Sequence, residues 1–203
     1  MPYGYLGTAP NQIKKNSGVF SVADINELEA KGHFGGSLEL IQSQTASSAS
    51  AINFTDLGNY EVHCLTLDNF QCTTSTTRYI ACRLSNDGGS SYESTSNYDR
   101  AWFRTDTGGT SSEIRNTGQT EMSNFFSIDN DNRTSQSVIY FYNLLDSAKY
   151  SFVTFHSFNS VGDYTYFGGF SYEVAETINA FSIYPDGDAI ATGNAKLYGV
   201  KEI

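Results

Sequence analysis

The chain has few of the residues that build metal and nucleophilic centres. Among its 203 residues there are three histidines and three cysteines, with no Cys-x-x-Cys pair. None of His33, His63 and His156 lies at ligand spacing from another histidine, cysteine or acid, and a zinc site needs about four converging ligands. His63 and Cys64 are adjacent, so on a strand they point to opposite faces and cannot readily pair. We therefore predict no catalytic residues, no metal and no cofactor.

The sequence also lacks an apolar run long enough to cross a membrane, and its N-terminus lacks a signal-peptide pattern. We expect no membrane insertion and no signal-directed secretion. Cys64 and Cys82 lie within expected strands, where a buried, reduced thiol is the simplest interpretation. A Cys64–Cys82 or Cys72–Cys82 bridge stays an alternative. The composition fits proteins of particles released by host lysis, and it also fits an ordinary cytoplasmic protein.

Basic residues are too few to balance the acids. Lysine and arginine number 12 against 22 aspartates and glutamates, which gives a formal net charge of −10. Residues 1–36 hold three lysines and three acids, so the whole negative charge belongs to the rest of the chain. A field of this sign repels phosphate backbones, so we expect no nucleic-acid partner.

Residues 1–36 have no hydrophobic period that would make a core, and we interpret them as an arm that docks on a larger assembly. Ser21 as N-cap, with Asp24 three residues later, predicts one short helix that ends at Gly32. A helix of about ten residues does not persist without tertiary contacts. The expected docking side chains are Tyr3, Tyr5, Leu6, Ile13, Val19, Phe20, Ile25 and Leu28.

From residue 37 to 203 the pattern is that of short strands separated by turns rich in Gly, Asn and Asp. About ten strands with no helix between them predict an all-β, antiparallel two-sheet sandwich with jelly-roll-like connections. The strand at 149–157 is apolar on both faces, which predicts burial on both sides, as at a subunit contact. The stretch 86–136 is polar and, apart from a strand at 101–105, is expected to be long loop. The other strands are expected near 37–44, 51–55, 60–67, 78–85, 137–143, 164–174, 178–184 and 194–201.

The aromatic residues of the sandwich have two interpretations. They can fill a core whose aliphatic content is modest. Alternatively, exposed rings form a platform that stacks on a sugar face or on a partner subunit. For this second interpretation the candidates are Tyr98, Trp102, Tyr164 and Tyr166.

Other motifs indicate turns. The run from Asp129 to Arg133 departs from an EF-hand loop, because Thr134 stands where the glycine belongs and Tyr140 where the closing glutamate belongs. We predict a polar turn there. No glycine pair has the following Lys-Ser/Thr of a phosphate-binding loop. No two acids are singled out as a glycosidase pair, since their separation is a spatial property.

Several segments resemble small structural proteins of marine bacteriophages. IKKNSGVFSVADINELEAKGHFGGSLELI, from residue 13, is similar to the opening of these proteins. SAINFTDLGNYEVHCLTLDN, RLSNDGGSSY and INAFSIYPDGDAIATGNAKLYGVK are similar to a domain of phage tail and appendage proteins, whose last strand ends in a Leu-Tyr-Gly-Val/Ile sequence. The resemblance covers about residues 10–201 but not roughly 90–135. It implies an oligomeric, often trimeric, appendage or decoration, and it supplies no catalytic residues.

These observations predict a non-enzymatic virion protein. The leading hypothesis is a tail appendage or fibre component, a homotrimer docked by residues 1–36 that displays the sandwich of residues 37–203 to a host-surface glycan. Two alternatives remain: a capsid decoration protein or head fibre, and a stand-alone carbohydrate-binding, lectin-like module. A glycan-degrading enzyme is a third class, for which the sequence names no acids.

Overall fold

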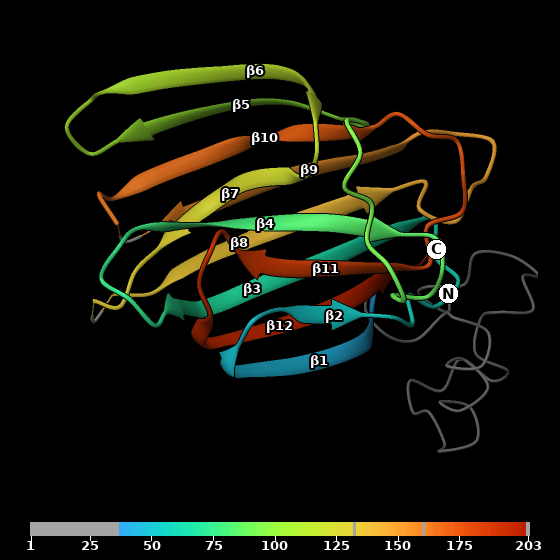
Figure 1. The fold of residues 1–203 in the computed structure, drawn as a ribbon, viewed down its shortest axis with the longest axis horizontal. Coiled ribbons are helices and arrows are strands. Elements are labelled where there is room, and N and C mark those ends of the chain that lie inside the picture. The colour runs from blue at the N-terminus through green and yellow to red at the C-terminus, as the bar shows by residue number, and fades with distance from the viewer. Residues whose placement is uncertain (1–36, 132, 160, 202–203) are drawn as a thin grey trace, which may run out of the picture. The chain divides into compact units, whose positions relative to one another are not determined.

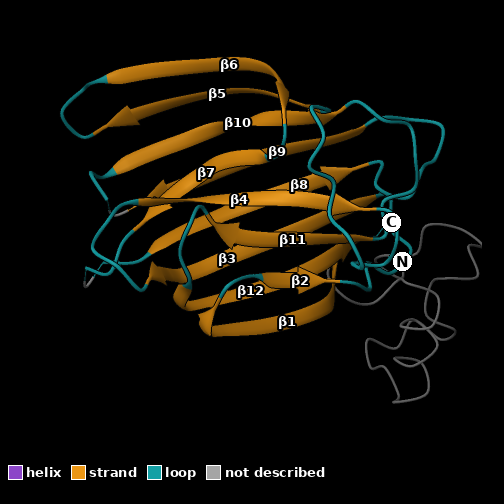
Figure 2. Ribbon diagram, viewed as in Figure 1, coloured by secondary structure: helices purple, strands orange, loops and turns teal. Residues whose placement is uncertain are grey.

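The computed structural model describes residues 37–201, apart from 132 and 160, and these residues form strands joined by turns and loops (Figure 2). The predicted arm, with its helix, His33 and its docking side chains, lies outside the described residues. The strands are β1 (Leu38–Ala49), β2 (Ile52–Phe54), β3 (Val62–Cys72), β4 (Arg78–Ser85), β5 (Tyr98–Asp106), β6 (Ser111–Gln119), β7 (Met122–Ile128), β8 (Ser135–Tyr142), β9 (Ser151–Asn159), β10 (Tyr164–Tyr172), β11 (Ala180–Pro185) and β12 (Ile190–Val200).

These strands form two antiparallel sheets of unequal size. The large sheet has eight strands in the order β1-β12-β3-β8-β9-β10-β5-β6, and the small sheet has four in the order β2-β11-β4-β7. Figure 1 shows the small sheet lying across part of the large one, with the β5–β6 hairpin beyond β7. The prediction of an all-β, antiparallel two-sheet sandwich is therefore confirmed.

The connections are those of a jelly roll with two added hairpins. Four antiparallel pairs are nested along the chain: β1 with β12, β2 with β11, β3 with β8, and β4 with β7. This nesting is the pairing of an eight-stranded jelly roll. The hairpin β5–β6 is inserted between β4 and β7, and the hairpin β9–β10 between β8 and β11. Both insertions join the same edge of the large sheet, which makes it twice as wide as the small one.

The expectation of a long loop over residues 86–136 is wrong, because β6 and β7 lie there in addition to the predicted strand, β5, and the three strands occupy about half of the stretch. β6 is an edge strand with mostly exposed side chains, so it contains almost no apolar residues to reveal it. The strand β7 is difficult to recognise in the sequence because it buries adjacent residues. Phe125 and Phe126 are adjacent and both buried, and Asn124 has a positive φ of 70°, so the two-residue alternation of a strand is lost.

The core between the sheets is built largely from aromatic rings. Phe125 of β7 meets Phe155 of β9 and Phe170 of β10, with ring centroids 5.1 Å and 4.8 Å away. Phe155 and Phe170 are themselves 5.6 Å apart. At the other end of the core Phe181 of β11 stacks on Phe141 of β8 at 4.7 Å. The interpretation that aromatic residues fill the core is correct for these side chains, all of which are less than 5% exposed.

Buried polar side chains add hydrogen bonds between the same elements. The Ser157 hydroxyl donates to the carbonyl of Phe125, and the Asn159 amide donates to the Ser127 hydroxyl. The Ser135 hydroxyl donates to the Ser127 carbonyl at 2.8 Å. Because β7 is an edge strand of the small sheet, these bonds tie an otherwise half-paired strand to β8 and β9 of the large sheet.

The three cysteines are free and buried, in agreement with the reduced-thiol interpretation. Burial raises the pKa of the thiols of Cys64, Cys72 and Cys82 above the ordinary value. A raised pKa leaves less thiolate, so these side chains are poor nucleophiles near neutral pH.

Replacing Phe155 by alanine should remove the ring that joins β7, β9 and β10. We expect Phe155→Ala to lower the free energy of unfolding by about 3–5 kcal/mol, because a large cavity opens in the core. Tyr150→Ala, at a position 47% exposed just before β9, should change it by less than about 0.5 kcal/mol. Urea denaturation followed by tryptophan fluorescence measures both, and equal losses would contradict this description of the core.

Candidate functional site

The outer side of the large sheet carries a group of exposed apolar side chains on neighbouring strands. We call the outward side chains of β8, β9, β10 and β5 the aromatic face. Its most exposed large residues, at 37–48% of their surface, are Val138, Tyr140, Phe152, Phe158 and Phe167. Contiguous exposed apolar patches of this kind in a chain that is otherwise polar mark interaction sites.

Strand register brings these residues together. Val138 of β8 lies opposite His156 of β9, and His156 lies opposite Phe167 of β10. Phe167 in turn lies opposite Phe103 of β5, with ring centroids 5.3 Å apart. The result is a cross-strand row over four strands, in which His156 is the only ionisable side chain.

Three of the four strands of the aromatic face, β8, β9 and β10, carry no formal charge, and the outward side of β5 carries Asp99. The sequences of β8, β9 and β10 contain no aspartate, glutamate, lysine or arginine, although the chain carries 34 such residues. Charged side chains lie on the two flanks of the face. Asp68 of β3 and Lys196 of β12 are on one flank, and Glu113 and Arg115 of β6 are on the other.

Two shallow depressions lie on this outer surface. The larger has a volume of about 640 Å³, and its floor includes Gly169 and Ala101, which are paired in register and have little or no side chain. Phe152 and Thr154 line one side, and Asp99, Arg115, Asn116 and Thr117 are among the residues on the other. The smaller depression, of about 300 Å³, lies between β3, β8 and β9, beside Val138, His156 and Phe158.

Three of the four aromatic residues predicted to form an exposed platform are in the interior. Tyr98, Trp102 and Tyr166 are 0%, 7% and 1% exposed, so the prediction of an exposed stacking surface is corrected for them. The physical reason is strand alternation: they sit on the inward side of β5 and β10. Trp102 packs against Tyr166 at 5.5 Å, and the Tyr98 hydroxyl bonds the backbone of Leu84 and Glu93.

The fourth candidate, Tyr164, is half-buried. The guanidinium of Arg104 lies over its ring, 4.7 Å from the centroid. Arg104 also donates to the Ser112 hydroxyl of β6 at 2.8 Å and to the Tyr166 hydroxyl at 3.4 Å. These contacts hold the β5–β6 hairpin at the edge of the core. Tyr164 therefore packs against Arg104 at the edge of the core, and it is not part of the aromatic face.

The exposed residues that sequence reasoning missed are Phe152, Phe158 and Phe167, with Val138 and Tyr140. Strict alternation along β10 would have found Phe167, because Tyr166 and Phe170 point inward and Phe167, next to Tyr166, must point outward. The strand at 149–157 was predicted to be buried on both sides, as at a subunit contact, but within one chain only one side is buried. Phe152 and His156 are exposed on one side of β9, and Val153 and Phe155 are buried on the other.

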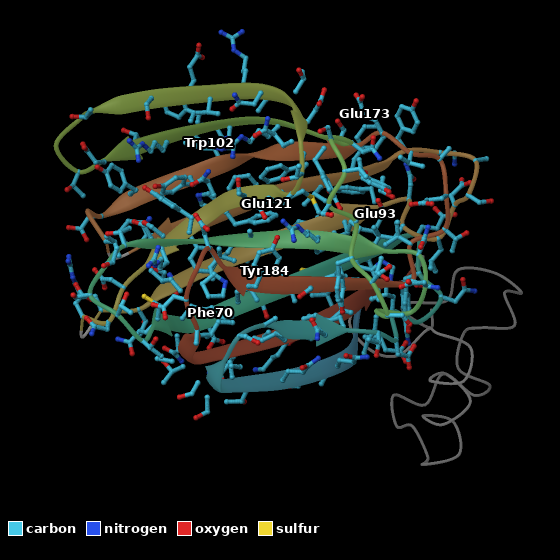
Figure 3. The ribbon with its side chains drawn as sticks, viewed as in Figure 1. Phe70, Glu93, Trp102, Glu121, Glu173 and Tyr184 are labelled. Atoms are coloured by element: carbon cyan, nitrogen blue, oxygen red, sulfur yellow. The ribbon has the colours of Figure 1, made fainter. Side chains whose placement is uncertain are left out.

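Outside the aromatic face, the small sheet carries a polar network on its outer side. The Glu121 carboxylate accepts hydrogen bonds from Arg83 at 3.1 Å and from the Tyr184 hydroxyl at 2.6 Å (Figure 3). The Arg83 guanidinium lies 5.4 Å from the centroid of the Tyr184 ring. The network joins β4, β11 and the turn before β7, so these three side chains have a structural role.

The described histidines do not form a metal site. Among the described residues, no group of three or more His, Cys, Asp and Glu side chains is placed to hold a metal ion. The run from Asp129 is a polar turn, in which Asp129 and Asp131 accept hydrogen bonds from the backbone N–H groups of Asp131 and Arg133. The part of the chain that the structure describes also contains no helix long and apolar enough to span a membrane.

His63 lies in the interior and Cys64 points to the other side of β3, as predicted. His63 Nε2 is 2.8 Å from the carbonyl oxygen of Leu57, a contact in which the ring N–H donates. Its Nδ1 atom is buried and has no hydrogen-bond partner. Burial lowers the pKa of His63, because the protonated ring would bury a positive charge with an unpaired N–H.

No protein-family model matches the chain, and no curated protein and no solved structure matches it. A function for this chain is therefore proposed from its own fold, surface and charge.

Lowering the pH from 7 to 5 should destabilise the fold through His63. Its pKa is lower folded than unfolded, so its contribution is fully present above about pH 6.5 and is lost as pH falls toward the folded pKa. Asp87 and Asp188, whose hydrogen bonds to Ser91 and Thr73 hold their pKa at about 2, lose their contributions only below about pH 4. Thermal unfolding at pH 7, 6 and 5 measures the slope. His63→Gln should flatten it, and an unchanged slope in that variant would contradict the assignment.

Proposed function

We propose that this chain is a non-enzymatic structural protein of a bacteriophage particle. In this proposal it is a tail appendage or fibre component that assembles as a homotrimer. Residues 1–36 dock it on other virion proteins, and the sandwich is displayed for attachment to the host surface. The alternative within the same class is a capsid decoration protein or head fibre.

The observation that carries the proposal is the aromatic face of the large sheet, which carries no formal charge on β8, β9 and β10. A displayed monomer with net charge −10 would have no physical reason to expose Phe152, Phe158 and Phe167 to water on adjacent strands. An assembly protein has such a reason, because interface cores are enriched in aromatic residues and depleted in charge. The jelly-roll fold supports the same class, since it is a common scaffold of viral capsid proteins and lectins.

The mass of the full-length chain in solution tests the proposal. We expect light scattering to give about three times the 22.3 kDa of one chain. A version that begins at Ser37 should keep this mass if residues 1–36 serve docking alone. A single-chain mass for the full-length protein at all concentrations would contradict a self-assembling appendage, and it would favour a protein that orders only on the capsid or a single binding module.

A carbohydrate-binding module is the second candidate, and the larger depression favours it. Its floor at Gly169 and Ala101 gives a sugar ring room to approach the exposed face of Phe152. Asp99, Asn116 and Thr117 on its opposite side offer the donors and acceptors that hydroxyl groups require.

Glycan binding by the full-length chain distinguishes this candidate. If it is correct, a glycan array should give specific hits that Phe152→Ala abolishes and Phe158→Ala keeps, because only Phe152 lines the larger depression. Hits that survive Phe152→Ala would place the sugar elsewhere, and an array without hits would leave the second candidate unsupported.

A further inference from the structure

The aromatic face together with its two flanks is large enough to serve as a protein interface. Seven strands, from β12 to β6, carry the face and its two flanks. With strands about 4.8 Å apart and about eight residues long, they cover roughly 29 Å by roughly 26 Å, or roughly 750 Å². A standard protein–protein interface buries about 800 Å² on each partner. The surface therefore has the size of a stable contact.

The charge of the chain limits what can cover this surface. A net charge of −10 repels a strongly acidic partner. A strongly basic partner is attracted to carboxylates, and it would bind elsewhere on the chain, because β8, β9 and β10 have none. Two copies of this chain repel each other at most orientations. They approach without placing carboxylates against carboxylates when they meet through these three uncharged strands.

The two flanks of the face are complementary to each other. One flank has a lysine and an aspartate, Lys196 and Asp68, and the other has an acid and a base, Glu113 and Arg115. Glu113 and Arg115 form an ion pair with each other at 2.8 Å, and both are strongly exposed, with 67% and 77% of their side-chain surface accessible. In a ring around an axis parallel to the strands, one flank of each copy meets the opposite flank of the next copy. Such a ring can pair Lys196 with Glu113 between neighbours, because both lie on the cross-strand row that runs through Val138, His156, Phe167 and Phe103.

The dimensions of the sheet suit a ring of three. If three sheets roughly 29 Å wide form the sides of a triangle, each sheet lies roughly 8 Å from the common axis. In two sheets that pack face to face, each sheet lies about 5 Å from the plane midway between them. Aromatic side chains are long enough to fill the distance to the axis, whereas serine and threonine side chains are not. Phe167 and His156 lie in the middle of the face, where the axis would pass.

We infer that a second copy of this chain covers the aromatic face, in a closed ring whose axis runs along the strands. The inference rests on the proposed homotrimer and names the surface that makes it. Phe152, Phe158, Phe167 and Val138 form the dry centre of the contact. The charged flanks form its rim and set which edge of one copy meets which edge of the next.

The test uses the full-length chain and light scattering at a series of concentrations. Phe167→Asp and, separately, Thr154→Lys each place one charge in the centre of the face, at exposed positions. We expect both to reduce the mass from about threefold to that of the 22.3 kDa chain. Asn53→Asp adds the same carboxylate at an exposed position of β2 on the small sheet, and it should keep the threefold mass. Thermal melts of the variants check that each one is folded.

A charge exchange tests the flanks. Lys196→Glu should weaken the assembly, measured as a higher midpoint concentration of dissociation, and adding Glu113→Lys should restore it. A folded Phe167→Asp and a folded Thr154→Lys that both keep the threefold mass would overturn the inference while the homotrimer stands. A single-chain mass for the unaltered protein would contradict the homotrimer itself. A chain that associates only after removal of residues 1–36 would overturn the inference, because those residues would then occupy the face.

Discussion

The cluster of Phe125, Phe155 and Phe170 is the contact on which the wide sheet depends. It is the place where the small sheet, through its edge strand β7, packs on the inserted hairpin β9–β10. The hydrogen bonds from Ser157 and Asn159 to β7 lie beside it. Without this contact β9 and β10 would have no partner for their inner face, and β5 and β6 would have no stable strand on which to pair.

The same strands explain why a binding surface exists at all. Because side chains alternate along a strand, a hairpin that sends Phe155 and Phe170 into the core sends Phe152, Phe158 and Phe167 to the outside. The small sheet covers one side of the large sheet, and nothing in the described residues covers the other. The core and the aromatic face are thus two sides of one hairpin, and assembly of several copies would give its outer side the burial that the inner side already has.

Much of the fold could be predicted from the sequence, and the functional surface only in part. Alternation and turn residues were sufficient for the two-sheet sandwich and for ten of its twelve strands, all except β6 and β7. They failed for β6, which as an edge strand buries little, and for β7, where adjacent Phe125 and Phe126 are both buried. The site prediction chose Tyr98, Trp102 and Tyr166 by their residue type, although their positions on β5 and β10 point inward. Alternation along β10 would have placed Tyr166 inside and Phe167 outside, whereas β9 is apolar on both faces, so its inner side depends on packing against distant strands.

The most direct measurement of whether the aromatic face is a subunit contact is the reactivity of a single cysteine placed on it. Thr154 is exposed in the middle of the face, and the native thiols are buried with raised pKa, so Thr154→Cys gives one reporter. Alkylation of this thiol should be slow at high protein concentration and should become fast on dilution, in step with the loss of the threefold mass. Fast alkylation at every concentration, with the threefold mass intact, would show that the face is open to solvent in the assembly and would contradict the account.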